Sequence, residues 1–145
     1  MKHMYSIALR FAEKFAPPEG TIEAHNNLIK KNGFVWYGKM GTQVSLANAD
    51  KVLKEEAPKI LLIHSGGIKR YWAYIEAISN EKPSFDEFPS YYHDISDNFK
   101  TWFKVVCIEE APGNVMSSCF VASSGQVLSI ASKHSMSPYF LIECK

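Results

Sequence analysis

The side chains with the clearest chemical potential are the aromatic rings that crowd the middle of the chain. Residues 71–103 carry 10 of the 19 aromatic side chains, and Tyr91 and Tyr92 stand in a predicted loop, where rings do not have to pack. Aromatic faces stack on flat rings, and a carboxylate such as that of Asp94 accepts hydrogen bonds from an exocyclic amine. This combination predicts a pocket for a flat, polar, uncharged ring.

The same rings have an ordinary structural explanation. Phe, Tyr and Trp side chains are usually largely buried, so an aromatic residue taken alone is assigned more readily to the core than to a binding site. For the two loop tyrosines both explanations stay open at this point.

Charge is distributed unevenly along a chain whose total is close to neutral. The 145 residues include 16 Lys and Arg against 15 Asp and Glu, a net charge of +1. Residues 1–70 hold a surplus of five positive charges, whereas residues 71–103 hold a surplus of four negative ones. Phosphate contacts must then come from the first half of the chain, where Lys39, Lys69 and Arg70 lie next to predicted turns.

Signatures of metal, nucleotide and hydrolase chemistry are absent from the sequence. The five histidines form neither an H-E-x-x-H nor an H-x-E…P-C-x-x-C pattern, and no P-loop, G-x-G-x-x-G or G-x-S-x-G segment occurs. We therefore predict no metal ion, no cofactor and no catalytic residues, and we favour a binding protein over an enzyme.

The spacing of the cysteines and the length of the apolar runs indicate the cellular compartment in which the protein is expected. Cys107, Cys119 and Cys144 form no C-x-x-C pair, and an odd number argues against a disulfide framework, so Cys107 and Cys119 are expected to be small buried hydrophobic residues. Apolar runs such as residues 60–63 fall far short of the roughly 18 residues that a membrane span requires. The chain is expected to be cytoplasmic, with no membrane partner.

Period-two alternation and turn residues predict several strands. Met4–Phe11 alternates cleanly between apolar and polar residues, which is typical of a strand with one buried face, and Lys59–His64 is typical of a short buried strand. Further strands are predicted over residues 34–39, 69–78, 100–109 and 139–144.

Two helices interrupt the first strands. Thr21 and Ser45 are residues that cap helices, and apolar residues follow each of them at helical spacing. Gly33 and Pro58 are natural ends for these two helices.

Two segments are harder to assign. Residues 81–98 contain two prolines and predict a long surface loop with up to one helical turn, and loops of this length tend to be functional. Residues 114–134 stay ambiguous. Together the elements predict one α+β domain over residues 1–145, with a mixed, partly open β-barrel of five to seven strands and two or three flanking helices.

Three stretches, taken in order, resemble a known superfamily. The first is ILLIHSGG with the following strand YWAYIEA, the second is YYHD with the later KTWFKV, and the third is the closing SMSPYFLI. They resemble the PUA-like superfamily, and within it the EVE and YTH-type domains most. The resemblance covers about two thirds of the chain, at its C-terminal end.

The resemblance implies a compact barrel that binds nucleic acid and, in the EVE and YTH branches, holds a flipped, modified base in an aromatic cage. The end of one strand and the start of its neighbour would frame the pocket, and the YYHD loop would close it. The implied base-binding residues are Ser65, Trp72, Tyr91, Tyr92 and Asp94; Trp36 and Tyr37 join them on their chemistry alone, and the phosphate-binding candidates remain Lys39, Lys69 and Arg70.

Our primary hypothesis is therefore a nucleic-acid-binding module that holds a flipped or single-stranded, modified base in an aromatic pocket. Its partner would be DNA or RNA that carries the modified base, and the modest charge favours a second protein that adds affinity or an effector activity. One alternative is a small nucleoside-directed hydrolase of ASCH-like type with Lys39, Glu76 or His64 as its base. The other is a protein-interaction module with the aromatic loop as its interface.

Overall fold

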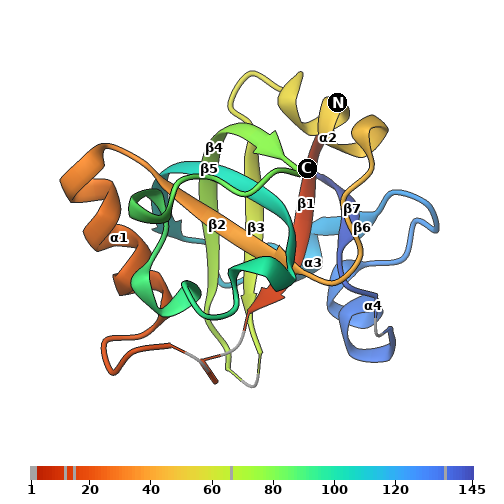
Figure 1. Cartoon of the computed structure of the whole chain (residues 1–145). Helices are drawn as coiled ribbons and strands as arrows, with labels where there is room; N and C mark the ends of the chain where they lie inside the picture. Colours follow the sequence, from red (N-terminus) through yellow and green to blue (C-terminus); the bar gives the residue numbers. More distant parts are fainter. Residues whose placement is uncertain (1–2, 12, 15, 66, 136) are drawn as a thin grey trace.

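Seven strands form one mixed β-sheet in a computed structural model of the protein, which describes residues 3–11, 13–14, 16–65, 67–135 and 137–145 (Figure 1). The strands are β1 (Met4–Phe11), β2 (Val35–Met40), β3 (Lys59–His64), β4 (Arg70–Ser79), β5 (Phe99–Glu110), β6 (Cys119–Val121) and β7 (Phe140–Cys144). Their order in the sheet is β2-β5-β4-β3-β1-β7-β6.

Four α-helices and three 3-10 turns connect the strands in the described part of the chain. The helices are α1 (Thr21–Asn32), α2 (Leu46–Leu53), α3 (Val115–Ser118) and α4 (Leu128–His134), and the 3-10 turns are η1 (Phe85–Glu87), η2 (Ser90–Tyr92) and η3 (Ser96–Asn98). The 3-10 turns all lie between β4 and β5, in the segment predicted as a long loop. This segment runs between α1 and the end of β1 (green in Figure 1).

The sheet is mixed because β1 and β3 run parallel, from Ile7 beside Ile60 to Phe11 beside His64. Every other neighbouring pair of described strands is antiparallel. The ends of β1 and β2 line one cavity although three strands separate them in the sheet, so the sheet is strongly curled. The predicted α+β class is confirmed. The sheet is open between β2 and β6, and its closure into a barrel stays a prediction.

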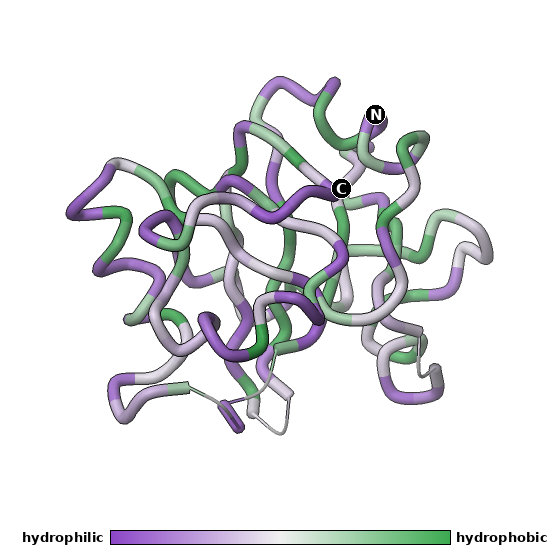
Figure 2. The backbone as a smooth tube through the Cα atoms, viewed as in Figure 1, coloured by the Kyte–Doolittle hydropathy of each residue, from purple (hydrophilic) through white to green (hydrophobic). Residues whose placement is uncertain are grey.

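Both faces of the central strands are buried. Along β1, Ile7 and Leu9 point to one side and Ala8 to the other, which corrects the expectation of a half-buried strand. The reason is that β1 pairs on both edges and lies between two packed layers, and Figure 2 shows hydrophobic residues along the central strands. The cavity-side cluster includes Ile7, Leu9, Val35, Tyr37, Leu62 and Phe103, and the disulfide-side cluster includes Ala8, Leu61, Trp72, Cys119, Leu128 and Cys144.

The two predicted helices begin and end close to their predicted residues. Ser45 caps α2, because its Oγ accepts a hydrogen bond from the Asn48 N–H at 3.2 Å. Gly33 ends α1 in the left-handed conformation that glycine adopts without strain. Thr21, expected to be the cap of α1, is instead its first residue, and Gly20 occupies the cap position.

The ambiguous stretch of residues 114–134 contains two short helices and a short strand. α3 has four residues, β6 has three and α4 has seven. Elements this short contain too few turns or alternations to give a readable period. They raise the number of helices above the predicted two or three.

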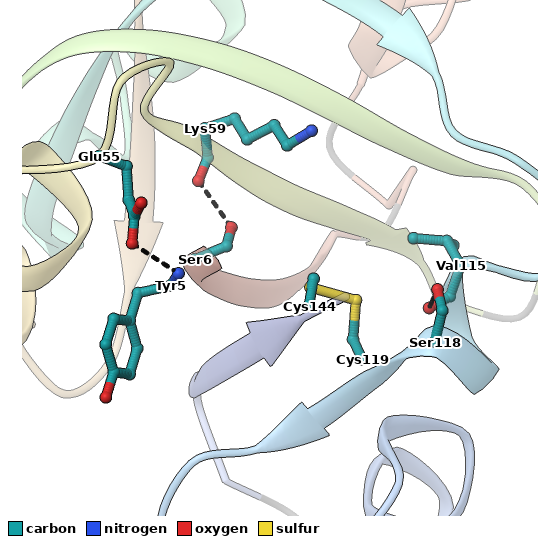
Figure 3. Close-up of a disulfide and its surroundings, with 8 residues drawn as sticks. All are labelled: Tyr5, Ser6, Glu55, Lys59, Val115, Ser118, Cys119 and Cys144. Carbon is teal, nitrogen blue, oxygen red and sulfur yellow. Dashed lines mark hydrogen bonds between the residues drawn. A yellow bond between two sulfur atoms is a disulfide. The ribbon is translucent and has the colours of Figure 1, made fainter. Parts of the chain in front are cut away.

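The predicted absence of a disulfide is wrong. Cys119 in β6 and Cys144 in β7 face one another in register, with Cα atoms 4.2 Å apart, and are joined by a disulfide (Figure 3). Their sequence separation of 25 conceals this pairing, because the pairing depends on two strands that return antiparallel. Cys107, expected to be buried, is exposed and free.

Some sequence predictions involve residues outside the described ranges. Gly66 of the predicted β3–β4 turn and Met136 of the closing SMSPYFLI stretch are two such residues. Among the described residues, no helix is both long enough and apolar enough to span a membrane.

Candidate functional site

A cavity of about 240 Å³ lies where the ends of β1 and β2 meet the 3-10 segment. Its walls come from distant parts of the chain, which the curl of the sheet brings together. β1 and the chain after it supply Leu9, Arg10, Phe11, Lys14 and Thr21; β2 supplies Tyr37, Gly38, Lys39 and Met40; the remainder are Tyr91, Tyr92, Ile95, Phe99 and Pro138.

Three tyrosines, Tyr37, Tyr91 and Tyr92, form what we call the tyrosine wall. Tyr37 and Tyr92 are each 4% exposed, whereas Tyr91 is half-buried. The Tyr91 and Tyr92 ring centroids are 4.8 Å apart, and Tyr92 lies 4.5 Å from Phe99. Burial raises the pKa of all three phenols, and their mutual proximity adds to the rise for Tyr37 and Tyr92. The wall is therefore neutral at physiological pH and offers hydroxyl hydrogen bonds.

A glycine in β2 allows the wall to close over the cavity. Gly38 pairs with Trp102 of β5, and a Cβ atom at Gly38 would come within 2.7 Å of the Phe99 ring. The register between β2 and β5 also shifts between Lys39 and Met40. Any larger residue at position 38 would therefore push the Phe99 ring from its place in the cavity lining.

His25 of α1 packs behind the tyrosine wall. Its ring centroid lies 5.1 Å from that of Tyr37 and 5.4 Å from that of Tyr92, and the side chain is 1% exposed. Burial lowers the pKa of His25 to about 4, so the ring is neutral at physiological pH. Its Nδ1 lies 2.8 Å from the Thr21 carbonyl oxygen, which makes Nδ1–H the donor, and Nε2 has no hydrogen-bond partner among the described residues.

Thr21, which lines the cavity, carries another polar atom without a regular hydrogen bond. The residue is 3% exposed, and although the pKa of Tyr91 reflects the nearness of the Thr21 side chain, Thr21 Oγ1 makes no hydrogen bond of ordinary geometry to a described residue. Buried polar atoms normally have partners. An unsatisfied hydroxyl in a cavity wall is a place where a ligand would supply one.

Arg10 is a fixed cation of the lining. Its guanidinium donates to the carbonyl oxygens of Ser132 and Ser135 at 2.6 and 2.7 Å and to that of Ser137 at 3.3 Å. These bonds tie β1 to the chain around the end of α4. They use most of the guanidinium donors, so Arg10 contributes charge and structure more than free hydrogen bonds.

Lys39 is the buried cation of the lining. It is 4% exposed, its Nζ donates to the Met40 carbonyl oxygen at 3.0 Å and to the Thr42 carbonyl oxygen, and Nζ lies 5.2 Å from the Tyr139 ring centroid. Burial lowers the pKa of Lys39. With Arg10 and Lys14 it gives the lining three basic side chains, and no Asp or Glu belongs to the lining.

Four of the sequence-predicted site residues meet at this cavity: Tyr37, Lys39, Tyr91 and Tyr92. Trp36 points to the other side of β2 and packs against the aromatic cluster around Trp102. Asp94 is exposed beyond the 3-10 turn and does not line the cavity.

The other predicted residues lie elsewhere. Ser65 is exposed, and its N–H donates to the Phe11 carbonyl oxygen at 2.7 Å. Trp72 is 6% exposed within the disulfide-side cluster. Lys69 forms an exposed ion pair with Glu110 at 3.8 Å, and Arg70 donates to backbone carbonyls of its own turn.

The candidate bases of the hydrolase alternative do not share a cavity. Lys39 lines the cavity described above, and His64 stacks on Phe11 at 5.0 Å at the end of β3. Glu76 forms an ion pair with Lys104 at 4.0 Å and lines neither the Lys39 cavity nor the pocket beside His64. Among the described residues, no cluster of three or more His, Cys, Asp or Glu side chains is arranged to hold a metal ion.

Sequence reasoning missed several members of the lining, above all Arg10, Lys14, Thr21 and Phe99. Arg10 stands on the polar face of a strand expected to face solvent, and Thr21 was expected to be a helix cap. The one available signal was Arg10 itself, a charged residue in a strand that proved to be buried on both faces.

Comparison with known proteins gives one match. A sequence model of the Pua-like family matches residues 7–138, which is most of the chain and includes the whole cavity lining. No curated protein and no solved structure matches the chain significantly.

Proposed function

We propose that this chain, which belongs to the Pua-like family, binds nucleic acid by holding one flipped or single-stranded base in the cavity beside the tyrosine wall. Membership of the family suggests nucleic-acid binding. The further steps, that the base is extruded and that it carries a modification as in EVE and YTH-type domains, are our proposal.

The observation that carries the proposal is the tyrosine wall with its free space. Stacking of a base on an aromatic side chain contributes about 1–3 kcal/mol. The cavity of about 240 Å³ is smaller than the roughly 300–1,000 Å³ of sites for drug-sized ligands, so it suits one base better than a longer segment. Tyr91 is the half-buried ring of the tyrosine wall, whereas Tyr37 and Tyr92 are buried, so it is the ring best placed to cover an entering base.

Selectivity for a modified base would follow from the enclosure. Extruding a base costs a few kcal/mol, which stacking and hydrogen bonds in the pocket must recover. A substituent that fills remaining space in an enclosed aromatic cavity adds buried apolar area, at about 25 cal/mol per Å². An open surface would give no such gain.

The basic side chains would hold the phosphates next to the bound base. Lys14 is exposed at the cavity, whereas Lys69 and Arg70 lie at the β3–β4 turn and remain candidates for phosphates further along the strand. Each phosphate contact steepens the salt dependence of the affinity by about one unit in the log–log slope. Salt titrations of Lys14→Ala and Lys69→Ala therefore measure which of the two sites contacts phosphate.

The test is fluorescence anisotropy with labelled single-stranded RNA and DNA of one sequence, carrying one central base with or without a methyl group. Tyr91→Ala is the site variant. Tyr74→Ala is its matched control, because Tyr74 is also a half-buried tyrosine but belongs to the disulfide-side cluster. We expect Tyr91→Ala to weaken binding about tenfold or more and Tyr74→Ala to leave it unchanged.

Equal affinities for the three proteins would remove the tyrosine wall from the binding site. The absence of binding to every oligonucleotide at low salt would overturn nucleic-acid binding as a whole. A third outcome is that Tyr91→Ala weakens binding but the wild type shows no preference for the methylated base. This result would support the pocket as the binding site and overturn the proposal that the base is modified.

A further inference from the structure

We propose that the ring bound in the cavity carries a negative charge on an oxyacid group, either a carboxylate on the base or a phosphate on its sugar. This inference rests on the proposed function and specifies the ligand of the same site. It departs from the uncharged ring that the sequence predicts, because the charges observed at the cavity differ from those expected there.

The first argument is the balance of charge around the cavity. Arg10, Lys14 and Lys39 belong to its lining, and no carboxylate does. Asp94, the expected acceptor for an exocyclic amine, is exposed and outside the lining. One carboxylate acts on the tyrosine wall from outside the lining: the Glu13 oxygens accept the Thr21 N–H at 3.2 and 3.3 Å, and the charge of Glu13 raises the pKa of Tyr37 and Tyr91. Three basic side chains in the lining outweigh this carboxylate.

The second argument is Lys39, a buried cation without a counter-charge. Its two hydrogen-bond acceptors are neutral backbone carbonyls, and Lys39 takes part in none of the ion pairs of the described residues. Burying a charge is costly unless an opposite charge accompanies it. A ligand anion in the cavity would supply the missing opposite charge.

Lys59, a partly buried lysine on the other face of the sheet, gives a comparison for Lys39. Lys59 lies over the Trp72 ring at 4.2 Å on the disulfide side, and Glu109 raises its pKa against the lowering effect of burial. Burial alone accounts for the lowered pKa of Lys39. Lys59 therefore has a carboxylate nearby that offsets its burial, and Lys39 at the cavity does not.

The third argument is the supply of hydrogen-bond donors. The tyrosine wall brings phenolic O–H groups to the lining, of which those of Tyr91 and Tyr92 also interact with one another, and Thr21 Oγ1 is buried without a partner of ordinary geometry. A carboxylate or phosphate accepts several hydrogen bonds at once, and bonds to an ionised acceptor are about twice as strong as neutral ones. An anion therefore fits the hydrogen-bond donors and basic side chains of this lining better than an amine would.

The experiment compares matched neutral and anionic probes in about 0.15 M salt. One arm uses an oligonucleotide with 5-methylcytosine or 5-carboxycytosine at the same position, and the other uses one oligonucleotide with a 5′-hydroxyl or a 5′-phosphate. Each pair is measured on the wild type, on Lys39→Met, on Lys14→Ala and on the control Lys54→Met. Lys54 is exposed, follows α2 and does not belong to the cavity lining.

We expect the anionic member of at least one pair to bind about tenfold more tightly, as one charge-assisted hydrogen-bond site would give. Lys39→Met, which keeps the length of the side chain, should abolish this preference, and Lys54→Met should keep it. Lys14→Ala changes an exposed residue, so a reduced preference there supports the inference even where Lys39→Met does not fold. A preference in the carboxyl arm identifies the base as the carrier, and one in the phosphate arm identifies the sugar.

Two results would overturn the inference and leave the proposed function intact. One is equal affinity for neutral and anionic probes while Tyr91→Ala still weakens both. The other is an anion preference that survives in both Lys39→Met and Lys14→Ala, which would mean that the anion binds elsewhere. A failure of every oligonucleotide to bind would overturn both proposals together.

Discussion

The two faces of the sheet carry similar residues in different arrangements. On the disulfide side, Trp72 lies under Lys59, with the ammonium 4.2 Å from the ring centroid, and neither residue lines any of the four pockets described for this structure. On the cavity side, Tyr37 and Lys39 stand in the same strand around a space of about 240 Å³. An aromatic ring and a lysine that pack directly against each other therefore form part of the core. The same two residue types form a candidate site where a cavity lies beside them.

Backbone geometry produces the difference. At the disulfide-side cluster, β3 pairs in regular register with β1 and with β4, and α3 and α4 add Val115, Leu128 and Ala131 to the cluster. On the cavity side, the β2–β5 register shifts after Lys39, and Gly38 leaves room for the Phe99 ring. If this comparison is right, substitutions on the disulfide side change stability alone, and substitutions on the cavity side change binding.

The largest effect is expected from Trp72→Ala. Removing a buried Trp side chain costs about 3–5 kcal/mol of unfolding free energy, because the surrounding residues cannot fill the space. Urea denaturation measures this loss. Without urea, where the variant is folded, its affinity for single-stranded oligonucleotides should equal that of the wild type. A loss of affinity in the folded variant would move the base to the disulfide side and reverse the comparison.

The next effect is expected from the disulfide. Replacing both Cys119 and Cys144 by Ala should lower the unfolding free energy by about 2–4 kcal/mol, because the bond closes a loop of 25 residues in the unfolded chain. Cys107→Ala, at an exposed free cysteine, is the control and should have almost no effect. Denaturation with and without reductant gives the same comparison on the wild type. Affinity for oligonucleotides should not change in any of these proteins.

The regular half of the molecule is the half that the sequence predicts. β1 and β3 have their predicted bounds, Met4–Phe11 and Lys59–His64, because alternation and short apolar runs report directly on strands. Gly33 and Ser45 mark helix boundaries because their roles depend on local backbone geometry. Local rules therefore suffice for local structure.

The site depends on relations that no local rule contains. Tyr91 and Tyr92 were found because their ring type alone suggests a pocket, whereas Arg10 and Thr21 join them only through the curl of the sheet. Cys119 meets Cys144 for the same kind of reason, through the pairing of β6 with β7. Predicting either contact requires the strand order, which the sequence does not display.

A smaller effect, on binding, is expected from the tyrosine wall. Tyr91→Ala should reduce the binding free energy by about 1–3 kcal/mol, the contribution of one stacked base. Its effect on stability should be smaller than that of Trp72→Ala, because the Tyr91 ring is only half-buried. Isothermal titration and urea denaturation of both variants give the four numbers that define the comparison. A stability loss as large as that of Trp72→Ala would make Tyr91 a core residue.

The smallest effect, counted per pH unit, is expected for the pH dependence of stability, which depends on His25 behind the tyrosine wall. Burial lowers the pKa of His25 in the folded protein to about 4, whereas an unfolded chain has the ordinary value near 6.5. Above about pH 6.5 the residue is neutral in both states and gives no pH dependence. As the pH falls from there toward about 4, only the unfolded state binds the proton, so stability decreases by up to about 1.4 kcal/mol per pH unit.

His25→Phe tests this because Phe retains the ring that packs against Tyr37 and Tyr92 and cannot be protonated. The slope of unfolding free energy against pH between about 6 and 4.5 should be shallower in His25→Phe than in the wild type. His134→Gln, at an exposed position of α4, should keep the wild-type slope. An unchanged slope in His25→Phe would mean that the imidazole reaches water behind the wall. The cavity side would then be open from the back as well as from its mouth, and Tyr91 would no longer be the ring that controls entry.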